Sequence, residues 1–291
     1  MAGLTGKTIG NSYKSLLRVD DDTNGIDTTQ ENVTDGEGTA SCLYIGDDQL
    51  GIRPQNDDTT SLFLVRNAGG SSLLAADSSN SVVKVNSGQD IANTQYAYFG
   101  VNYQDFSAIS ANTHYAIPFS ASGGTNLTND VDFGTGTDPD TSFTTANTDT
   151  QYASQIVPMM WYVQDNIAID AITSIEGGDN AAGDTTRMHL LSYTFNSGSS
   201  SALASGTVLA YNSDVTNGGS EQAYKSTWTV SSGNVDAGKV ILAFFRSDSV
   251  NSDYSLHITI KYHLGRGKYA TIITKLTFAN RTRKVIQILP F

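Results

Sequence analysis

Short apolar runs alternate with clusters of small polar residues along most of this chain. Between residues 60 and 88 three such runs follow one another at intervals of about ten residues, the spacing of short strands joined by turns. The gaps at 67–72 and 77–81 are filled mostly by Asn, Gly, Ser and Asp, which accept positive φ or bond their own backbone. The stretch therefore predicts a ladder of three strands with two sharp reversals.

Longer strand candidates dominate the second half of the chain. The last of them alternates without interruption and sets Tyr254, Leu256, Ile258, Ile260 and Tyr262 on one face. No helical periodicity is sustained beyond about two turns, which argues against parallel crossovers. The pattern predicts an all-β chain whose larger part is an antiparallel β-sandwich, most simply a jelly roll. The candidates are 156–163, 167–175, 188–195, 202–211, 223–230, 239–247 and 254–263.

A change in residue composition near residue 92 predicts a domain boundary. Aromatic residues are absent between Phe63 and Tyr96 and frequent afterwards. We therefore expect a short N-terminal stacked or interwoven β-region at 1–92, a jelly-roll sandwich at 93–264 and a C-terminal extension at 265–291. Within the sandwich, residues 120–151 are rich in Gly, Thr, Asn and Asp and predict a large exposed loop with one strand at 131–133.

Charge is distributed unevenly along the chain. All 29 acidic residues precede Lys261, whereas seven of the 17 basic residues lie from Lys261 onward. The acidic bulk repels nucleic acid and anionic membranes, and no run is long enough to insert into a membrane. The tail also carries apolar runs, so we expect it to dock on an acidic protein neighbour or pair with a neighbouring subunit. Cys42 is the only cysteine, which excludes an intrachain disulfide and suits a reducing cytosol.

The predicted loop at 120–151 contains oxygen-bearing side chains of the kind that bind calcium. It carries Asn129 and four carboxylates on a stretch that contains Gly, but it lacks the spacing and the closing Glu of an EF-hand. A solvated loop explains the same composition, so we predict neither a metal nor a cofactor. The weak metal candidates are Asp130, Asp132, Asp138 and Asp140.

The sequence offers little for catalysis. It contains no nucleophile elbow, no phosphate-binding loop and no Cys/His pair, so we expect no enzyme activity. Aromatic residues on the strands raise a different function, because any that face outward could stack on sugar rings of a surface glycan. The weak candidates are Trp161, Tyr224 and Trp228, and the alternative for each is burial in the core or in a subunit interface.

Three motifs in the first ninety residues carry a resemblance to a known class of protein. They are TIGNSYK at 8–14, DGEGTAS at 35–41 and LLAADSSNSVVKVN at 73–86. This part of the chain resembles the N-terminal region of structural fibre proteins of tailed bacteriophages, especially marine ones. The segment 224–263 is similar to the terminal strands of jelly-roll domains at fibre tips.

The resemblance implies a virion protein, most often a homotrimer, that is assembled in the host cytoplasm. Its N-terminal part would attach to portal, neck, tail or capsid proteins, and its sandwich would face outward towards a host surface glycan or protein. Two alternatives remain open, a capsid decoration or vertex protein without a receptor, and a glycan-binding tip module. A short stack of strands cannot bury both faces within one chain, so we expect three chains to complete it. The trimer candidates are Leu62, Leu64, Leu73, Val83 and Val85.

Overall fold

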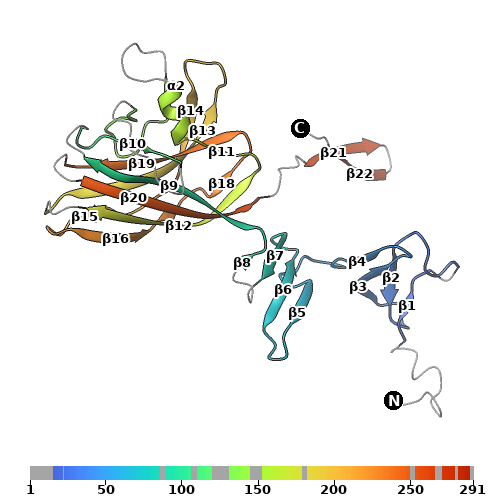
Figure 1. Ribbon diagram of the computed structural model, residues 1–291. Helices are drawn as coiled ribbons and strands as arrows, with labels where there is room; N and C mark the ends of the chain where they lie inside the picture. The colour runs from blue at the N-terminus through green and yellow to red at the C-terminus, as the bar shows by residue number, and fades with distance from the viewer. Residues whose placement is uncertain are drawn as a thin grey trace. The chain divides into compact units, whose positions relative to one another are not determined.

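The chain divides into two compact units, Met1–Asn93 and Thr94–Phe291, each described here by itself (Figure 1). Strands dominate both units. The computed structural model describes residues 16–21, 23–85, 90–105, 110–119, 131–144, 153–178, 182–249, 253–265, 271–278 and 281–288.

The first unit contains two four-stranded antiparallel sheets in which each strand pairs with the next one along the chain. The predicted ladder at 60–88 is confirmed as β5, β6 and β7, and β8 extends it. The first sheet consists of β1 (Arg18–Val19), β2 (Glu31–Thr34), β3 (Ala40–Ile45) and β4 (Leu50–Ile52). The second consists of β5 (Phe63–Arg66), β6 (Ser72–Asp77), β7 (Val82–Val85) and β8 (Asp90–Ile91).

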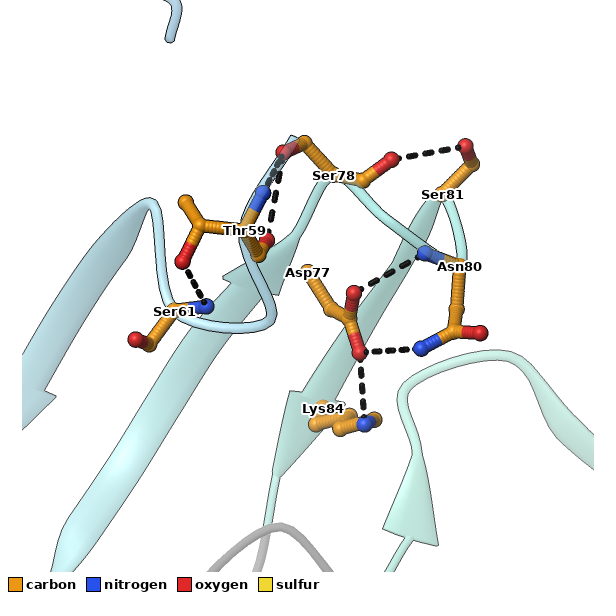
Figure 2. A network of polar contacts seen from close by, with 7 residues as sticks. All are labelled: Thr59, Ser61, Asp77, Ser78, Asn80, Ser81 and Lys84. Atoms are coloured by element: carbon orange, nitrogen blue, oxygen red, sulfur yellow. Dashed lines mark hydrogen bonds and ion pairs between the residues drawn. The ribbon is translucent and has the colours of Figure 1, made fainter. Parts of the chain in front are cut away.

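The turn between β6 and β7 is fixed by the side chain of Asp77 (Figure 2). Its carboxylate accepts hydrogen bonds from the backbone and side-chain amides of Asn80, at 2.9 and 2.8 Å. It also pairs with the Nζ of Lys84 at 2.7 Å. The Lys84 and Asn80 hydrogen bonds lower the pKa of Asp77 to about 2. The Asp and Asn of the predicted turn thus close it through their own side chains.

The second unit is built on two antiparallel sheets that face each other (Figure 1). One has the strand order β16-β12-β20-β9, and the other has β10-β19-β13-β14 with β17 beyond it. The first is made of β9 (Thr94–Asp105), β12 (Ile167–Gly178), β16 (Gln222–Thr227) and β20 (Asp253–Leu264). The second is made of β10 (Tyr115–Ile117), β13 (Thr185–Phe195), β14 (Leu203–Tyr211) and β19 (Lys239–Ser247). Short strands β11 (Trp161–Tyr162), β15 (Val215–Thr216), β17 (Thr229–Val230) and β18 (Asn234–Val235) extend them.

The connections between these eight strands give the jelly roll. Along the chain, β9, β12, β16 and β20 go to one sheet, and β10, β13, β14 and β19 go to the other. Every pairing is antiparallel, and spatial neighbours such as β20 and β9 lie far apart in sequence. An eight-stranded double sheet with such crossovers is a jelly roll. The predicted all-β fold with an antiparallel sandwich is therefore confirmed.

The inner core lies between the two sheets. Alternate residues of β20, from Tyr254 through Ile258 to Ile260, are buried there, as the sequence alternation predicts. From the opposite sheet, Leu190 and Phe245 complete the same cluster.

A second core covers the outer face of the β10-β19-β13-β14 sheet. Val131, Phe133 and Phe143 are at most 3% exposed and pack against Leu242 and Phe244 of β19. Residues 131–144 are therefore a covering layer, and the prediction of a wholly exposed loop at 120–151 is wrong for this part. The strand expected at 131–133 is reduced to one bridge, Tyr115 to Asp132. Residues 120–130 and 145–151 lie outside the described part of the chain.

The run 156–163 is not one strand, as predicted. It begins at the end of a short helix, α2 (Ala153–Ile156), and continues as the 3-10 turn η4 (Val157–Met159) before the two residues of β11. Pro158 lies in the first turn of η4, where its missing N–H costs nothing, whereas a strand interior would lose a ladder hydrogen bond. Ile156 and Met159 are buried in the second core.

The C-terminal extension contains a β-hairpin. Strand β21 (Thr271–Phe278) pairs with β22 (Arg281–Ile288) along their whole length, from Thr271 opposite Ile288 to Phe278 opposite Arg281. The expected docking of this extension on a neighbouring protein stays a prediction.

Candidate functional site

Strands β5, β6 and β7 of the second sheet share a face whose paired residues are all apolar. Residues paired across an antiparallel sheet point to the same side, and residues two apart along a strand do so as well. The register aligns Phe63 with Ala76 and Val83, and Val65 with Leu74 and Val85. We call these six residues the apolar face.

The apolar face is open to solvent. Phe63, Val65 and Val83 are 42%, 41% and 42% exposed, and the other three members are half-buried. Both clusters of buried hydrophobic side chains found among the described residues belong to the second unit. A small sheet that belongs to neither hydrophobic cluster is marginal in water, so this exposed face is suited to contact with another chain.

The structure divides the five predicted trimer residues between two faces. Val83 and Val85 belong to the apolar face. Leu64 lies opposite Ala75 and Lys84 on the other face, and Leu62 shares it two residues earlier along the chain. Leu73 lies at the register shift between β5 and β6, where it has no paired residue, and is 54% exposed. One axis therefore cannot take all five, whereas Phe63, Val65 and Leu74 join the two valines. The alternation of residues along the paired strands is the sequence signal that could have identified Phe63, Val65 and Leu74 as members of this face.

A separate pocket of about 240 Å³ lies in the jelly roll. Both sheets contribute to it, since β11 pairs with β19 of one sheet while β9, β12 and β20 belong to the other. Its polar and aromatic lining comes from three distant parts of the chain. The lining residues are Gln95, Trp161, Tyr162, Val163, Gln164, Asp165, Ile167, Tyr262 and Leu264.

Trp161 lines this pocket and is held in place by aromatic neighbours. Its ring stacks on Phe119 with centroids 5.7 Å apart and contacts Tyr262 at 5.0 Å. The Tyr262 hydroxyl donates to Oε1 of Gln95 at 2.8 Å, and burial raises the pKa of Tyr262, which keeps that proton in place. Trp161 is only 9% exposed, so these contacts hold its ring in one orientation.

The rim of the pocket is polar and accessible. Tyr162 is 47% exposed, and Gln164 and Asp165 are exposed beside it. Asp165 is the sole charged residue in the lining. Aromatic surface with amide and carboxylate groups at the edge can bind a small, partly apolar, hydroxyl-bearing ligand.

The other two glycan-stacking candidates are occupied elsewhere. Trp228 is 6% exposed, and its Nε1 donates to the Ser174 hydroxyl at 2.9 Å within the inner core, so it offers no face to a glycan. Tyr224 is half-buried on β16, where its hydroxyl donates to Gln222 at 2.6 Å and accepts from the Gly218 amide at 2.9 Å. Of the three candidates, Trp161 alone lines the pocket.

The carboxylates of the candidate metal loop have other contacts. Asp138 Oδ1 lies 3.4 Å from Nε2 of the buried His189, and the Asp132 carboxylate accepts from the Gly134 amide at 3.3 Å. The backbone oxygen of Asp140 accepts from the Tyr193 hydroxyl at 2.7 Å. In the described part of the chain no three His, Cys, Asp or Glu residues gather as a metal site would require, and Asp130 lies outside it.

Two buried histidines lie beneath this loop. The rings of His114 and His189 are 5.1 Å apart and edge to face, and His114 Nε2 is 3.0 Å from the Gly136 oxygen. Burial lowers the pKa of His189 to about 3 and also lowers that of His114. The pair is therefore neutral at neutral pH, and it supports the covering layer as part of the structure.

Comparison with known proteins assigns this chain to no family. The sequence matches no family model and no curated protein. Two solved structures are similar in shape. The Eiger TNF of S. frugiperda is 10% identical, with a TM-score of 0.28 over 62% of this chain and 98% of that one. An aminopeptidase from a marine sediment Thaumarchaeota archaeon is 7% identical, with a TM-score of 0.29 over 66% of this chain and 40% of that one. Similarity at this level supports no conclusion about function or assembly.

Among the described residues, no helix has both the length and the apolar character needed to cross a bilayer.

Proposed function

We propose that this chain is a structural virion protein of a tailed bacteriophage, a fibre that self-associates as a homotrimer and displays its jelly roll outward. The motifs at 8–14, 35–41 and 73–86 support the class of protein through their resemblance to phage fibres. Its role in the particle is assembly and adhesion rather than catalysis. Its partners are other copies of itself and the virion proteins to which its N-terminal region attaches.

The observation that carries the proposal is the apolar face of the β5–β8 sheet. Its six side chains lie in two rows across three strands, and Asp90 of β8 borders one row beside Val85. A second copy of the same face has the matching chemistry, because it too must remove apolar surface from water. The opposite face carries the Asp77–Lys84 ion pair, in which the Asp77 carboxylate is buried. Self-association through the apolar face would thus complete the fold of the first unit.

The oligomeric state of the purified full chain tests this proposal. At micromolar concentration, sedimentation equilibrium is expected to give three times the 31.0 kDa of the chain. Replacement of Val85 by Asp places a charge in the apolar face, so it should yield monomers. Leu64→Asp is the matched control, because Leu64 lies on the other face opposite Ala75 and Lys84, and this variant should leave the trimer intact.

Two outcomes would overturn self-association through this face. One is a wild-type chain that sediments as a stable folded monomer. The other is a Leu64→Asp variant that dissociates as readily as Val85→Asp. Near-UV circular dichroism of each variant reports whether the jelly roll has kept its packing.

The place in the virion needs a separate experiment. Purified particles of a phage that encodes this sequence are labelled with gold-conjugated antibody against the jelly roll and imaged by negative stain. We expect label at a fibre of the head, neck or tail. Particles that carry no label, from a lysate in which the protein is found free, would contradict a virion role.

A further inference from the structure

We propose that the Trp161 pocket binds one ring of a neutral saccharide, and that this is how the displayed jelly roll adheres to a surface glycan. The inference rests on the proposed function for its biological setting, and its physical basis is the pocket alone. Trp161, Tyr162 and Tyr262 supply the apolar surface, and Gln95, Gln164 and Asp165 supply the polar groups.

The aromatic residues match the amphipathic shape of a sugar. One face of a pyranose ring presents C–H groups, which pack on an aromatic ring, while its hydroxyls point outward around the edge. Contacts with Phe119 and Tyr262 fix Trp161 in the pocket lining, and Tyr162, which is 47% exposed, supplies the open ring on which a sugar can stack. A preformed platform of this kind lowers the entropy cost of taking up a ligand.

The polar residues match the hydroxyls. Because Oε1 of Gln95 already accepts from Tyr262, the orientation of that amide is fixed and its NH₂ group remains as a donor. Asp165 and Gln164 at the exposed rim add a carboxylate and a second amide. Donors and acceptors are thus both present, as a hydroxyl that both donates and accepts requires.

The volume and the charge of the pocket further restrict the class of ligand that it can bind. At about 240 Å³ the pocket is smaller than the roughly 300 to 1,000 Å³ of sites that bury drug-sized ligands, so it accommodates one sugar unit. Its one charged lining residue, Asp165, is an acid, and the chain as a whole carries a net charge of −12. Anionic sugars are therefore disfavoured relative to neutral ones.

A quaternary ammonium group is the main competing ligand, because aromatic residues beside a carboxylate also form cation-binding cages. Such a cation makes no use of hydrogen-bond donors, since its methyl groups cover the charge. The fixed amide of Gln95 favours the saccharide. Choline is accordingly included in the test as the competitor.

The experiment uses the full chain and two readouts. Methyl glycosides of glucose, galactose, mannose and N-acetylglucosamine are titrated, with choline and sialic acid as comparators. One small ring should bind with a Kd on the order of 1 mM. Saturation-transfer NMR measures binding, and tryptophan fluorescence locates it, because Trp161 lines the pocket while Trp228 is buried in the inner core.

Three variants test the lining. Tyr162→Ala removes an exposed stacking surface and should weaken binding about tenfold. Trp161→Phe keeps a ring in place for folding and should abolish the fluorescence change while NMR still detects weaker binding. Tyr96→Ala is the matched control, since Tyr96 is 53% exposed and is not part of the pocket lining, and it should bind as the wild type does.

The outcomes separate this inference from the proposed function. Val85→Asp monomers should bind a methyl glycoside as the wild type does but lose attachment to a surface coated with the matching polysaccharide, because three linked sites act together. Binding of choline in preference to every glycoside, or glycoside binding that Tyr162→Ala leaves unchanged, would overturn the saccharide site. Neither result bears on whether the chain forms a trimer.

Discussion

Glu176 gives the sharpest prediction about stability. It lies on β12 with its side chain between the two sheets and is 2% exposed. The Thr186 hydroxyl of β13 donates to Oε1 at 2.7 Å, while Oε2 has no hydrogen-bond partner among the described residues. Burial raises the pKa of this carboxyl from 4.5 to about 7, and the Thr186 hydrogen bond offsets only part of that effect. We predict that Glu176→Gln stabilises the jelly roll at alkaline pH.

The magnitude follows from proton linkage. Below pH 4.5 the carboxyl is protonated in both the folded and the unfolded chain, so it adds no pH dependence. As the pH rises from 4.5 to about 7 the unfolded chain ionises first, and the free energy of unfolding falls. Above that range the loss is complete and amounts to about 3 kcal/mol. Gln cannot ionise, so the variant escapes this loss.

Urea unfolding at about pH 4 and about pH 8 measures the effect, followed by tryptophan fluorescence. Both tryptophans, Trp161 and Trp228, belong to the jelly roll, so the signal reports on that unit. The unpaired amide group of Gln adds a constant cost, so the diagnostic quantity is the change in the variant's advantage between the two pH values. Glu221→Gln, an exposed site, is the control and should show no such change. A Glu176→Gln advantage that is equal at both pH values would refute the reasoning.

Two further predictions concern the outer face of the β10-β19-β13-β14 sheet. Burial lowers the pKa of His189 to about 3, so the free energy of unfolding should fall as the pH drops below 6.5, by about 2 kcal/mol at pH 5. In urea titrations, His189→Gln should reduce this dependence of the unfolding free energy on pH. An unchanged pH dependence in the variant would contradict the prediction. Phe133→Ala should lower the free energy of unfolding by about 3 to 5 kcal/mol, because its ring is fully buried in the second core. A loss below about 0.5 kcal/mol would indicate a solvated loop instead.

The sequence predicts the structure best where one face of a strand is buried and the other face is exposed to solvent. The alternation in β20 fixes which residues enter the inner core, and the ladder at 60–88 has turn residues that close their own turns. It predicts worst where a segment contributes only a few apolar side chains. Residues 131–144 look like a solvated loop because Gly, Thr and Asp outnumber Val131, Phe133 and Phe143.

A signal for the covering layer is nevertheless present in the sequence. In β19, residues 240–245 are apolar without a break, and all six are buried. A strand with one wet face alternates, whereas a strand buried on both faces reads as a continuous run. That run requires something to cover the outer face of its sheet, although it cannot say which segment does so.

The pocket could not be predicted in the same way. Trp161, Gln95 and Tyr262 come from separate strands, and no spacing along the chain relates them. The jelly-roll crossovers bring β9 beside β20 and place β11 at the edge of the other sheet. Side chains that meet only through such pairings leave no local pattern, so sequence reasoning could single out Trp161 but not its partners.

The covering layer also bears on where the chain self-associates. A jelly roll has two outer sheet faces, and one of them here is closed by the chain's own residues, with the Tyr193 hydroxyl donating to Asp140 and the Gly206 amide donating to Thr141. The outer face of the β16-β12-β20-β9 sheet carries polar side chains such as Thr259 and Lys261. The apolar face of β5, β6 and β7, by contrast, is exposed and carries six apolar side chains.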